Sequence, residues 1–269
     1  MSYLEAIIFG IIQGITEFLP ISSTAHIVIT EIIFDSDFPG LGFEIFLHMA
    51  SILAVLIYFY NEIVNVISGF FSFLFFNKTQ KNRVQFYFGL YLIIATVITG
   101  FLGLLLESLV TDIMKTTAFI GGALLVTGLF LVLIEKFQNY GNRNEAEMSL
   151  KDALVVGLGQ TLAVLPGISR SGTTLISGLW VGLKRKTAVR YSFLLLIPVV
   201  LGSSVLSYKD FGAGYFTNLE TGPLLVAFLT SFIFSLAGII WLIDILKKKK
   251  LSFLAIYCFL VGSILIFAA

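Results

Sequence analysis

The chain has 269 residues, 58% of them hydrophobic and 12% charged, and a formal net charge of +1. This composition excludes a soluble globular domain, and the single cysteine, Cys258, excludes a disulfide within the chain. Apolar segments of about 18 or more residues recur along the whole chain, so a lone signal peptide or anchor does not account for them. We therefore expect an all-α polytopic membrane protein built as a single integral membrane domain.

The first apolar region, residues 3–34, is too long for one membrane span and too short for two spans with a turn. The segment LPISST around Pro20 interrupts it. A helix of about 15 residues before this break is about 22 Å long, which is less than the ~30 Å thickness of the hydrocarbon layer. These features predict a re-entrant hairpin, in which two half-helices enter and leave on the same side and meet at a polar loop near the midplane.

Three full transmembrane helices are expected to follow, over residues 43–60, 84–106 and 116–137. A second re-entrant hairpin is predicted over residues 150–182, broken by LPGISRSG around Pro166 and Gly167. Three more full spans are expected over residues 188–208, 222–246 and 251–268. The prediction is thus six full transmembrane helices plus two re-entrant helical hairpins. Residues 70–76 allow three interpretations: an interfacial helix, a homodimer contact or a lipid-facing surface.

The basic residues indicate how these segments lie in the membrane. If each hairpin returns to its own side, one face collects fourteen of the seventeen Lys and Arg residues: Lys78, Lys81, Arg83, Lys136, Arg143, Lys151, Lys184, Arg185, Lys186, Arg190 and the lysines at 247–250. The other face has only Lys115 and Lys209, so the positive-inside rule puts the first face in the cytoplasm and both termini outside. The lysine run is then a loop at the lipid headgroups, and nucleic acid is not an expected partner.

The two interrupted regions resemble each other. A shift of 147 positions aligns Ala6 with Ala153, Gly10 with Gly157, Gln13 with Gln160, Ile21 with Ile168 and Ser22 with Ser169. Each half then has one hairpin and three spans, and an odd number of crossings inverts the second half. This predicts an inverted-topology repeat, with repeat 1 over about 1–140 and repeat 2 over about 148–269, whose broken helices meet near the midplane.

Arg170 lies at the second break, where a guanidinium costs several kcal/mol unless an anion or water meets it. One interpretation is a structural ion pair with Glu17, and the other is an anionic ligand. In PGISRSGTT, glycines flank hydroxyl groups where the returning half-helix begins, so Ser169, Ser171, Thr174 and backbone N–H groups are candidates to surround a phosphate. Arginine supplies paired donors that match phosphate oxygens, which favours the ligand.

In the first hairpin, Gln13 and Glu17 are four residues apart and share a helix face directed at the break. Together they are candidates to hold one metal ion, although a lone glutamine on a buried helix is equally an inter-helix hydrogen bonder. A carboxylate at this depth needs a cation or a proton. Three roles are therefore open for Glu17: ligand of a divalent metal, partner of Arg170, or general base.

Ser22, Ser23 and Thr24 follow Pro20, and at least one of the three hydroxyls is expected to cap the returning half-helix. His26 comes three positions, about one turn, after Ser23. A serine hydroxyl and an imidazole can therefore face the same pocket, as in sites with an activated nucleophile. His48, by contrast, is predicted to be a hydrogen bonder in helix packing.

GIIQGITEFLPISSTAHIVI and LPGISRSGTT resemble the two signatures of the undecaprenyl-diphosphate phosphatase family, the bacitracin-resistance type of lipid-carrier phosphatase. The family's first motif is a Glu or Gln followed four residues later by Glu, then a proline, two serines and a histidine. The second is a proline-glycine-x-serine-arginine-serine run. The matching residues are Gln13, Glu17, Pro20, Ser22, Ser23 and His26 in the first motif and Pro166, Gly167, Ser169, Arg170, Ser171 and Thr174 in the second.

The resemblance implies a metal-dependent enzyme of the bacterial inner membrane. It would remove the terminal phosphate from a C55 isoprenoid diphosphate and so regenerate the carrier lipid of cell-wall synthesis. The expected metal is Mg²⁺ or Ca²⁺, both of which prefer oxygen ligands. Many members carry Glu where this chain has Gln13, and because an amide adds no negative charge we expect weaker metal retention here.

The expected mechanism places the isoprenoid tail in lipid and the diphosphate in a midplane pocket that opens to the outer side. Arg170 and the hydroxyls of Ser22, Ser169, Ser171 and Thr174 bind phosphate. The family guides the choice of Ser23 as nucleophile, with His26 or Glu17 taking its proton and with His26 or Ser22 as alternative nucleophiles. The rival prediction is a polyprenyl-phosphate flippase or transporter that uses the same pocket.

Overall fold

The computed structural model describes residues 1–36, 42–107, 114, 116–137, 141–206, 220–248 and 251–268. Within these ranges the elements are α-helices and short 3-10 helices, apart from one isolated backbone bridge between Arg143 and Leu183. The all-α prediction is therefore confirmed. Four lysines that entered the charge argument, Lys115, Lys209, Lys249 and Lys250, lie outside the described residues.

The first interrupted region forms two helices, α1 (Tyr3–Phe18) and α2 (Ser23–Phe34). α1 ends where it does because Pro20 disfavours helical backbone in the residue before it, and Leu19 accordingly has φ −62° and ψ 130°. Ser22 then caps α2 by accepting a backbone N–H through its side chain. The φ of Ser22 is 70°, a strained value for a residue with a side chain, so backbone strain is stored directly before Ser23.

The second interrupted region forms α7 (Leu150–Thr161), the short η3 (Leu162–Val164) and α8 (Arg170–Trp180). Its break turns at Gly167, where φ is +91° and an added Cβ would lie 2.7 Å from Ala123. Thr127 of α6 (Thr117–Phe137) donates to the carbonyl of Gly167 and accepts from the N–H of Ser169, both at 3.1 Å. Protein groups thus satisfy this non-helical backbone, as a break inside a membrane requires.

Four helices in the described residues are long and apolar enough to cross a membrane: α5 (Gln80–Glu107), α6, α9 (Arg185–Leu206) and α10 (Thr221–Lys248). A fifth candidate is the pair α3 (Gly42–Tyr58) and α4 (Tyr60–Phe75), if it is taken as one bent span. The last helix, α11 (Ser252–Phe267), is apolar but has 16 residues. The protein is therefore an integral membrane protein with four to five candidate spans by length and composition.

The helix expected over residues 43–60 corresponds to α3, and the bend that follows it into α4 was not predicted. α3 and α4 meet at 78° around Phe59, whose backbone has φ −101° and ψ 22°. The ring of Phe59 is buried against Phe193 of α9, with ring centroids 5.3 Å apart. In the predicted segment 70–76, Phe70 packs on Phe86 while Phe76 is 79% exposed. The three interpretations of that segment stay predictions.

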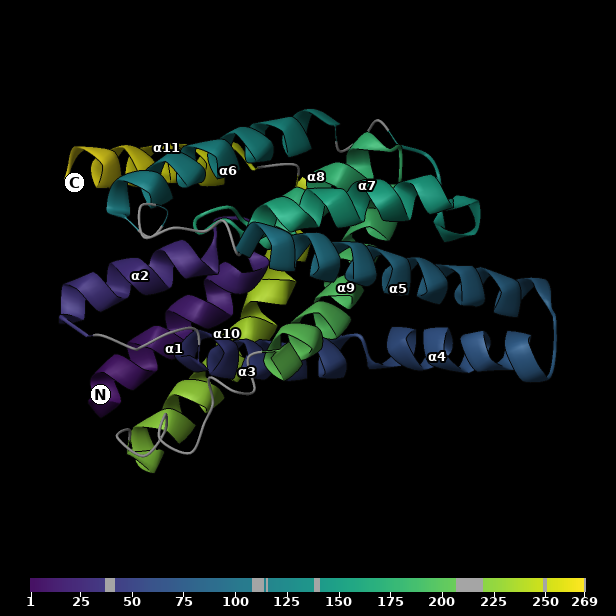
Figure 1. Cartoon of the computed structure of the whole chain (residues 1–269), viewed down its shortest axis with the longest axis horizontal. Helices are drawn as coiled ribbons and strands as arrows, with labels where there is room; N and C mark the ends of the chain where they lie inside the picture. Colours follow the sequence, from purple (N-terminus) through teal and green to yellow (C-terminus); the bar gives the residue numbers. More distant parts are fainter. Residues whose placement is uncertain are drawn as a thin grey trace.

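The helices pack in pairs (Figure 1). α1 crosses α10, α5 runs beside α4, and α6 lies along α11. Glycines allow close approach at two of these crossings. An added Cβ at Gly10 of α1 would lie 2.6 Å from the Ala227 carbonyl of α10, and one at Gly121 of α6 would lie 2.6 Å from the Gly262 carbonyl of α11. Both ends of the chain lie at one end of the molecule, and the turn between α4 and α5 lies at the other (Figure 1).

Candidate active site

The carboxylate of Glu17, near the end of α1, is the centre of a buried polar cluster. Glu17 is 4% exposed. Its Oε1 accepts from Arg170 Nη2 at 2.5 Å, and its Oε2 accepts from Ser23 Oγ at 2.7 Å and from Gln13 Nε2 at 3.1 Å. His48 Nε2 lies 3.0 Å from the same Oε2. Side chains from α2, α3 and α8, together with one from α1 itself, therefore meet at a single carboxylate.

The two breaks lie against each other at this point. Ser23 is the first residue of α2 and Arg170 is the first residue of α8, so both half-helices begin at Glu17. Helix N-termini carry a partial positive charge and free backbone N–H groups, and they favour anions. The structure therefore brings together Glu17, Gln13, Ser23 and Arg170 as the sequence predicted, at a place suited to negative charge.

His26 is placed beside the break but does not bind Ser23. Its Nδ1 lies 2.7 Å from the Ser22 carbonyl oxygen, and because a carbonyl only accepts, Nδ1 carries the proton. Its Nε2 lies 2.7 Å from the hydroxyl of Tyr257 in α11, and the two rings stack with centroids 5.6 Å apart. Both ring nitrogens are thus engaged, and the contact of His26 with the break is through the strained residue Ser22.

The hydroxyls at the second break make contacts with one another and with helix backbone. Ser169 is the N-cap of α8 and accepts from the N–H of Gly172 at 3.1 Å. Its Oγ also lies 3.1 Å from Ser171 Oγ. Thr174 donates to the Arg170 carbonyl at 3.0 Å and lies 2.5 Å from Ser192 Oγ of α9. Ser169 and Ser171 therefore surround the start of α8, whereas the hydroxyl of Thr174 is directed at α9.

His48, predicted as a hydrogen bonder in helix packing, joins α3 to α1, but the sequence analysis did not predict that its partner is Glu17. A second residue that the sequence analysis missed is Glu44, whose carboxylate accepts a hydrogen bond from Thr24 of α2. Glu44 and His48 are four residues apart in a mostly apolar helix, the same spacing as Gln13 and Glu17. This i, i+4 spacing of polar residues was the sequence signal that could have identified both Glu44 and His48 as site residues.

The expectation that one of the three hydroxyls after Pro20 caps α2 is confirmed, and Ser22 is the cap.

Gln13 and Glu17 offer oxygen atoms that fit a divalent cation. Gln13 is fully buried, and its Oε1 has no hydrogen-bond partner in the described part of the chain. A buried carbonyl oxygen left unpaired costs about 1–3 kcal/mol, and an oxygen-preferring cation would satisfy it. Within the described residues no three His, Cys, Asp or Glu side chains gather into a metal cluster. The donor set therefore suits an ion that takes its other ligands from a substrate.

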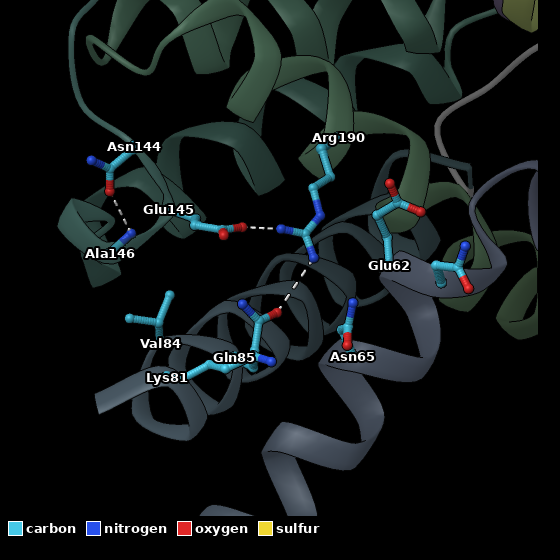
Figure 2. Close-up of a pocket in the computed structure, with 10 residues that line it drawn as sticks. Glu62, Asn65, Lys81, Val84, Gln85, Asn144, Glu145, Ala146 and Arg190 are labelled. Carbon is cyan, nitrogen blue, oxygen red and sulfur yellow. Dashed lines mark hydrogen bonds and ion pairs between the residues drawn. The ribbon is translucent and has the colours of Figure 1, made fainter. Parts of the chain in front are cut away.

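A cavity of about 510 Å³ lies elsewhere, between α4, α5, α9 and η2 (Glu145–Glu147) (Figure 2). Arg190 extends into it, forms an ion pair with Glu145 and donates to Gln85 Oε1 at 3.3 Å. None of the residues in the two signature segments lines this cavity. The chemistry predicted from the sequence belongs to the buried cluster around Glu17 and not to this hollow.

Comparisons with known proteins identify the family. Residues 6–264 match the family described as "Bacitracin resistance protein BacA". A protein of Halalkalibacterium halodurans named Undecaprenyl-diphosphatase 2 is 61% identical over 260 residues, covering 96% of this chain and 93% of its own. Undecaprenyl-diphosphatase 1 of Shouchella clausii is 49% identical over 268 residues, covering 99% and 96% of the two chains. Undecaprenyl-diphosphatase 3 of Bacillus anthracis is 37% identical over 261 residues, or 96% and 95%. The chain therefore belongs to the bacitracin-resistance protein BacA family.

Proposed function

We propose that this protein hydrolyses the terminal phosphate of undecaprenyl diphosphate, giving undecaprenyl phosphate and inorganic phosphate. Membership of the BacA family and the names of its relatives support this activity. The observation that carries it is the convergence of Ser23 and Arg170 on Glu17, because it joins a hydroxyl, a carboxylate and a guanidinium. The rival prediction of a flippase or transporter has no support from the comparisons.

Arg170 is the main phosphate-binding residue in this proposal. One of its nitrogens donates to Glu17, and its remaining guanidinium N–H groups have no partner among the described residues. Those donors match two oxygens of one phosphate. The N-terminal N–H groups of α2 and α8 and the hydroxyls of Ser169 and Ser171 add neutral donors around the same point. Ser22 and Thr174 contribute indirectly: Ser22 caps the start of α2, and Thr174 donates to the Arg170 carbonyl at the start of α8.

Ser23 attacks the terminal phosphorus, with Glu17 as the base. Ser23 Oγ already donates to Glu17 Oε2, so the proton has an acceptor in place. As the Oγ–P bond forms, the bond from phosphorus to the bridging oxygen breaks, and undecaprenyl phosphate leaves with the electron pair. Water then attacks the phosphoserine and gives a proton to Glu17, and the serine oxygen takes the proton that Glu17 held from the first step. His26 stabilises the turn before Ser23 by donating from Nδ1 to the Ser22 carbonyl.

A divalent ion, Mg²⁺ or Ca²⁺, belongs to the proposal. Gln13 and Glu17 would hold it together with phosphate oxygens, and it would supply positive charge that offsets the charge of the diphosphate. Because Gln13 contributes an amide oxygen and no charge, retention of the ion depends strongly on the bound diphosphate.

We also infer the six-span, two-hairpin topology and the inverted repeat. Each repeat begins with a matching cap: Glu5 accepts from the N–H of Ser2 at 3.1 Å, and Asp152 accepts from the N–H of Ser149 at 2.7 Å. Ser149 lies 147 positions after Ser2, and Asp152 lies 147 positions after Glu5. The packing corresponds as well, since α1 crosses α10 at Gly10 and α7 meets α5 at Gly157, where an added Cβ would lie 3.1 Å from Ala95. In this topology the basic face is cytoplasmic in the bacterial inner membrane and the site opens outward.

Two experiments test these proposals. Purified protein in detergent should release inorganic phosphate from undecaprenyl diphosphate, and a chelator should abolish the release; an inactive, folded, metal-supplied protein would refute the activity. For the topology, single cysteines are introduced as Tyr3→Cys and Lys248→Cys in a Cys258→Ser background. In intact cells a membrane-impermeant maleimide should label the first position and not the second. The reverse pattern would refute the orientation.

A further inference from the structure

We propose that His48 is a positioning residue for the reaction: it holds Oε2 of Glu17 toward Ser23 while the diphosphate is bound. This inference rests on the proposed function and adds a residue that neither signature contains. The contact itself is direct, since His48 Nε2 lies 3.0 Å from Glu17 Oε2, the oxygen that accepts from Ser23 Oγ at 2.7 Å.

The imidazole of His48 has a fixed orientation. Its Nδ1 lies 2.7 Å from the carbonyl of Glu44, one turn earlier in α3, and donates to it because a carbonyl only accepts. The carboxylate of Glu17 is likewise an acceptor for Arg170, Gln13 and Ser23. His48 therefore donates from both nitrogens, and neither ring rotation nor a flip keeps both bonds.

The helix that carries His48 is attached directly to the site. Glu44 accepts from Thr24, the residue after Ser23, so the first turn of α3 is attached to the start of α2. A donor on such a helix positions its acceptor accurately.

His48 matters most when substrate is present. In the structure, Arg170 restrains Oε1 of Glu17 from the opposite side. A diphosphate bound to the other N–H groups of Arg170 shares its positive charge and weakens this restraint. Apart from Ser23 itself, the other donors to the carboxylate are His48 and Gln13, and both act on Oε2. Gln13 is also a candidate metal ligand, so His48 is the donor with no other role in the proposed reaction.

The test compares His48→Ala with His48→Gln, whose amide N–H can replace the Nε2 donor. We expect His48→Ala to lower kcat roughly 10- to 100-fold with KM within about threefold, as for a misplacement of the base by about 1 Å. His48→Gln should keep kcat within about fivefold of wild type.

Labelling of Ser23 by an alkyl fluorophosphonate, followed by mass spectrometry, should slow in His48→Ala and not in His48→Gln. This labelling needs no turnover, so a wild-type protein that labels but releases no phosphate would refute the proposed function and leave His48 testable.

Ser51→Ala is the matched control, because it removes a buried hydrogen bond of the same helix away from Glu17. It should leave kcat and the labelling rate unchanged. The inference is overturned if His48→Ala keeps wild-type kcat, if only KM rises, if Gln is as inactive as Ala, or if Ser51→Ala loses as much kcat. Should His48→Ala not fold, His48→Asn replaces it, since its amide is one methylene too short; equal kcat for Asn and Gln then overturns the inference.

Discussion

Ser23 and Arg170 occupy the same position in their half-helices, the first residue of α2 and of α8, and both bind the carboxylate of Glu17. They are also 147 positions apart, the shift that aligns the two interrupted regions. One interrupted region therefore supplies a hydroxyl and the other a guanidinium at aligned positions. The proposed division of labour between nucleophile and phosphate-binding residue follows from this difference at a single position.

Replacing Ser23 by Ala should lower kcat at least about 10³-fold, because the attacking oxygen is lost. The thermal unfolding midpoint and the binding of lipid diphosphate should stay near wild type. Thr30→Ala is the control, since Thr30 lies in the same helix and donates only to the carbonyl of His26. Normal turnover by Ser23→Ala would exclude Ser23 as the nucleophile.

Substitutions of Glu17 and Arg170 should be coupled in their effects on stability as well as on activity. Arg170→Ala breaks a buried ion pair of Glu17, and we expect a loss of about 3–5 kcal/mol. Adding Glu17→Gln should restore part of that stability, because the charge of the buried carboxylate is removed, but no activity. Thermal unfolding and phosphate release of the two single variants and the double variant measure this. Additive stability losses would contradict a direct interaction.

Gln13→Glu should strengthen metal binding, because a second carboxylate would stand beside Glu17. We expect the Mg²⁺ or Ca²⁺ concentration for half-maximal phosphate release to fall roughly tenfold. Gln160→Glu adds the same charge at the aligned position of the second interrupted region, where the amide binds Thr99 and not Glu17. It should leave the metal requirement unchanged. A metal requirement that moves equally in both variants would argue against ligation by Gln13.

Two adjacent glycines of α6 should respond oppositely to substitution by alanine. An added Cβ at Gly121 meets the Gly262 carbonyl at 2.6 Å, whereas one at Gly122 meets nothing within 4 Å. Gly121→Ala should therefore lower stability by about 1–3 kcal/mol. Gly122→Ala should be neutral or stabilising by up to about 1 kcal/mol, because alanine favours helix. Thermal unfolding of the two variants in the same detergent provides the comparison, and equal midpoints would contradict the α6–α11 packing.

The sequence was sufficient to predict a structural feature where residues at that position determine the backbone conformation. Pro20 ends α1 and Gly167 turns the second break, so both breaks lie where the residues predicted them. The sequence was insufficient where a feature involves contact with a residue far along the chain. At the bend after α3, Phe59 packs on the distant ring of Phe193, and the contact of His48 with Glu17 depends on how α3 is rotated toward α1. Likewise, the imidazole of His26 was expected to face Ser23, but the hydroxyl of Tyr257, far along the chain, binds it instead.

The α6–α11 pair is bonded to both breaks, one through each helix. Thr127 of α6 bonds the backbone on both sides of Ile168 in the second break, and Tyr257 of α11 bonds His26, which in turn bonds the Ser22 carbonyl in the first break. A shift of either helix in this pair is therefore transmitted to a break beside Glu17, although neither Thr127 nor Tyr257 bonds Glu17 among the described residues.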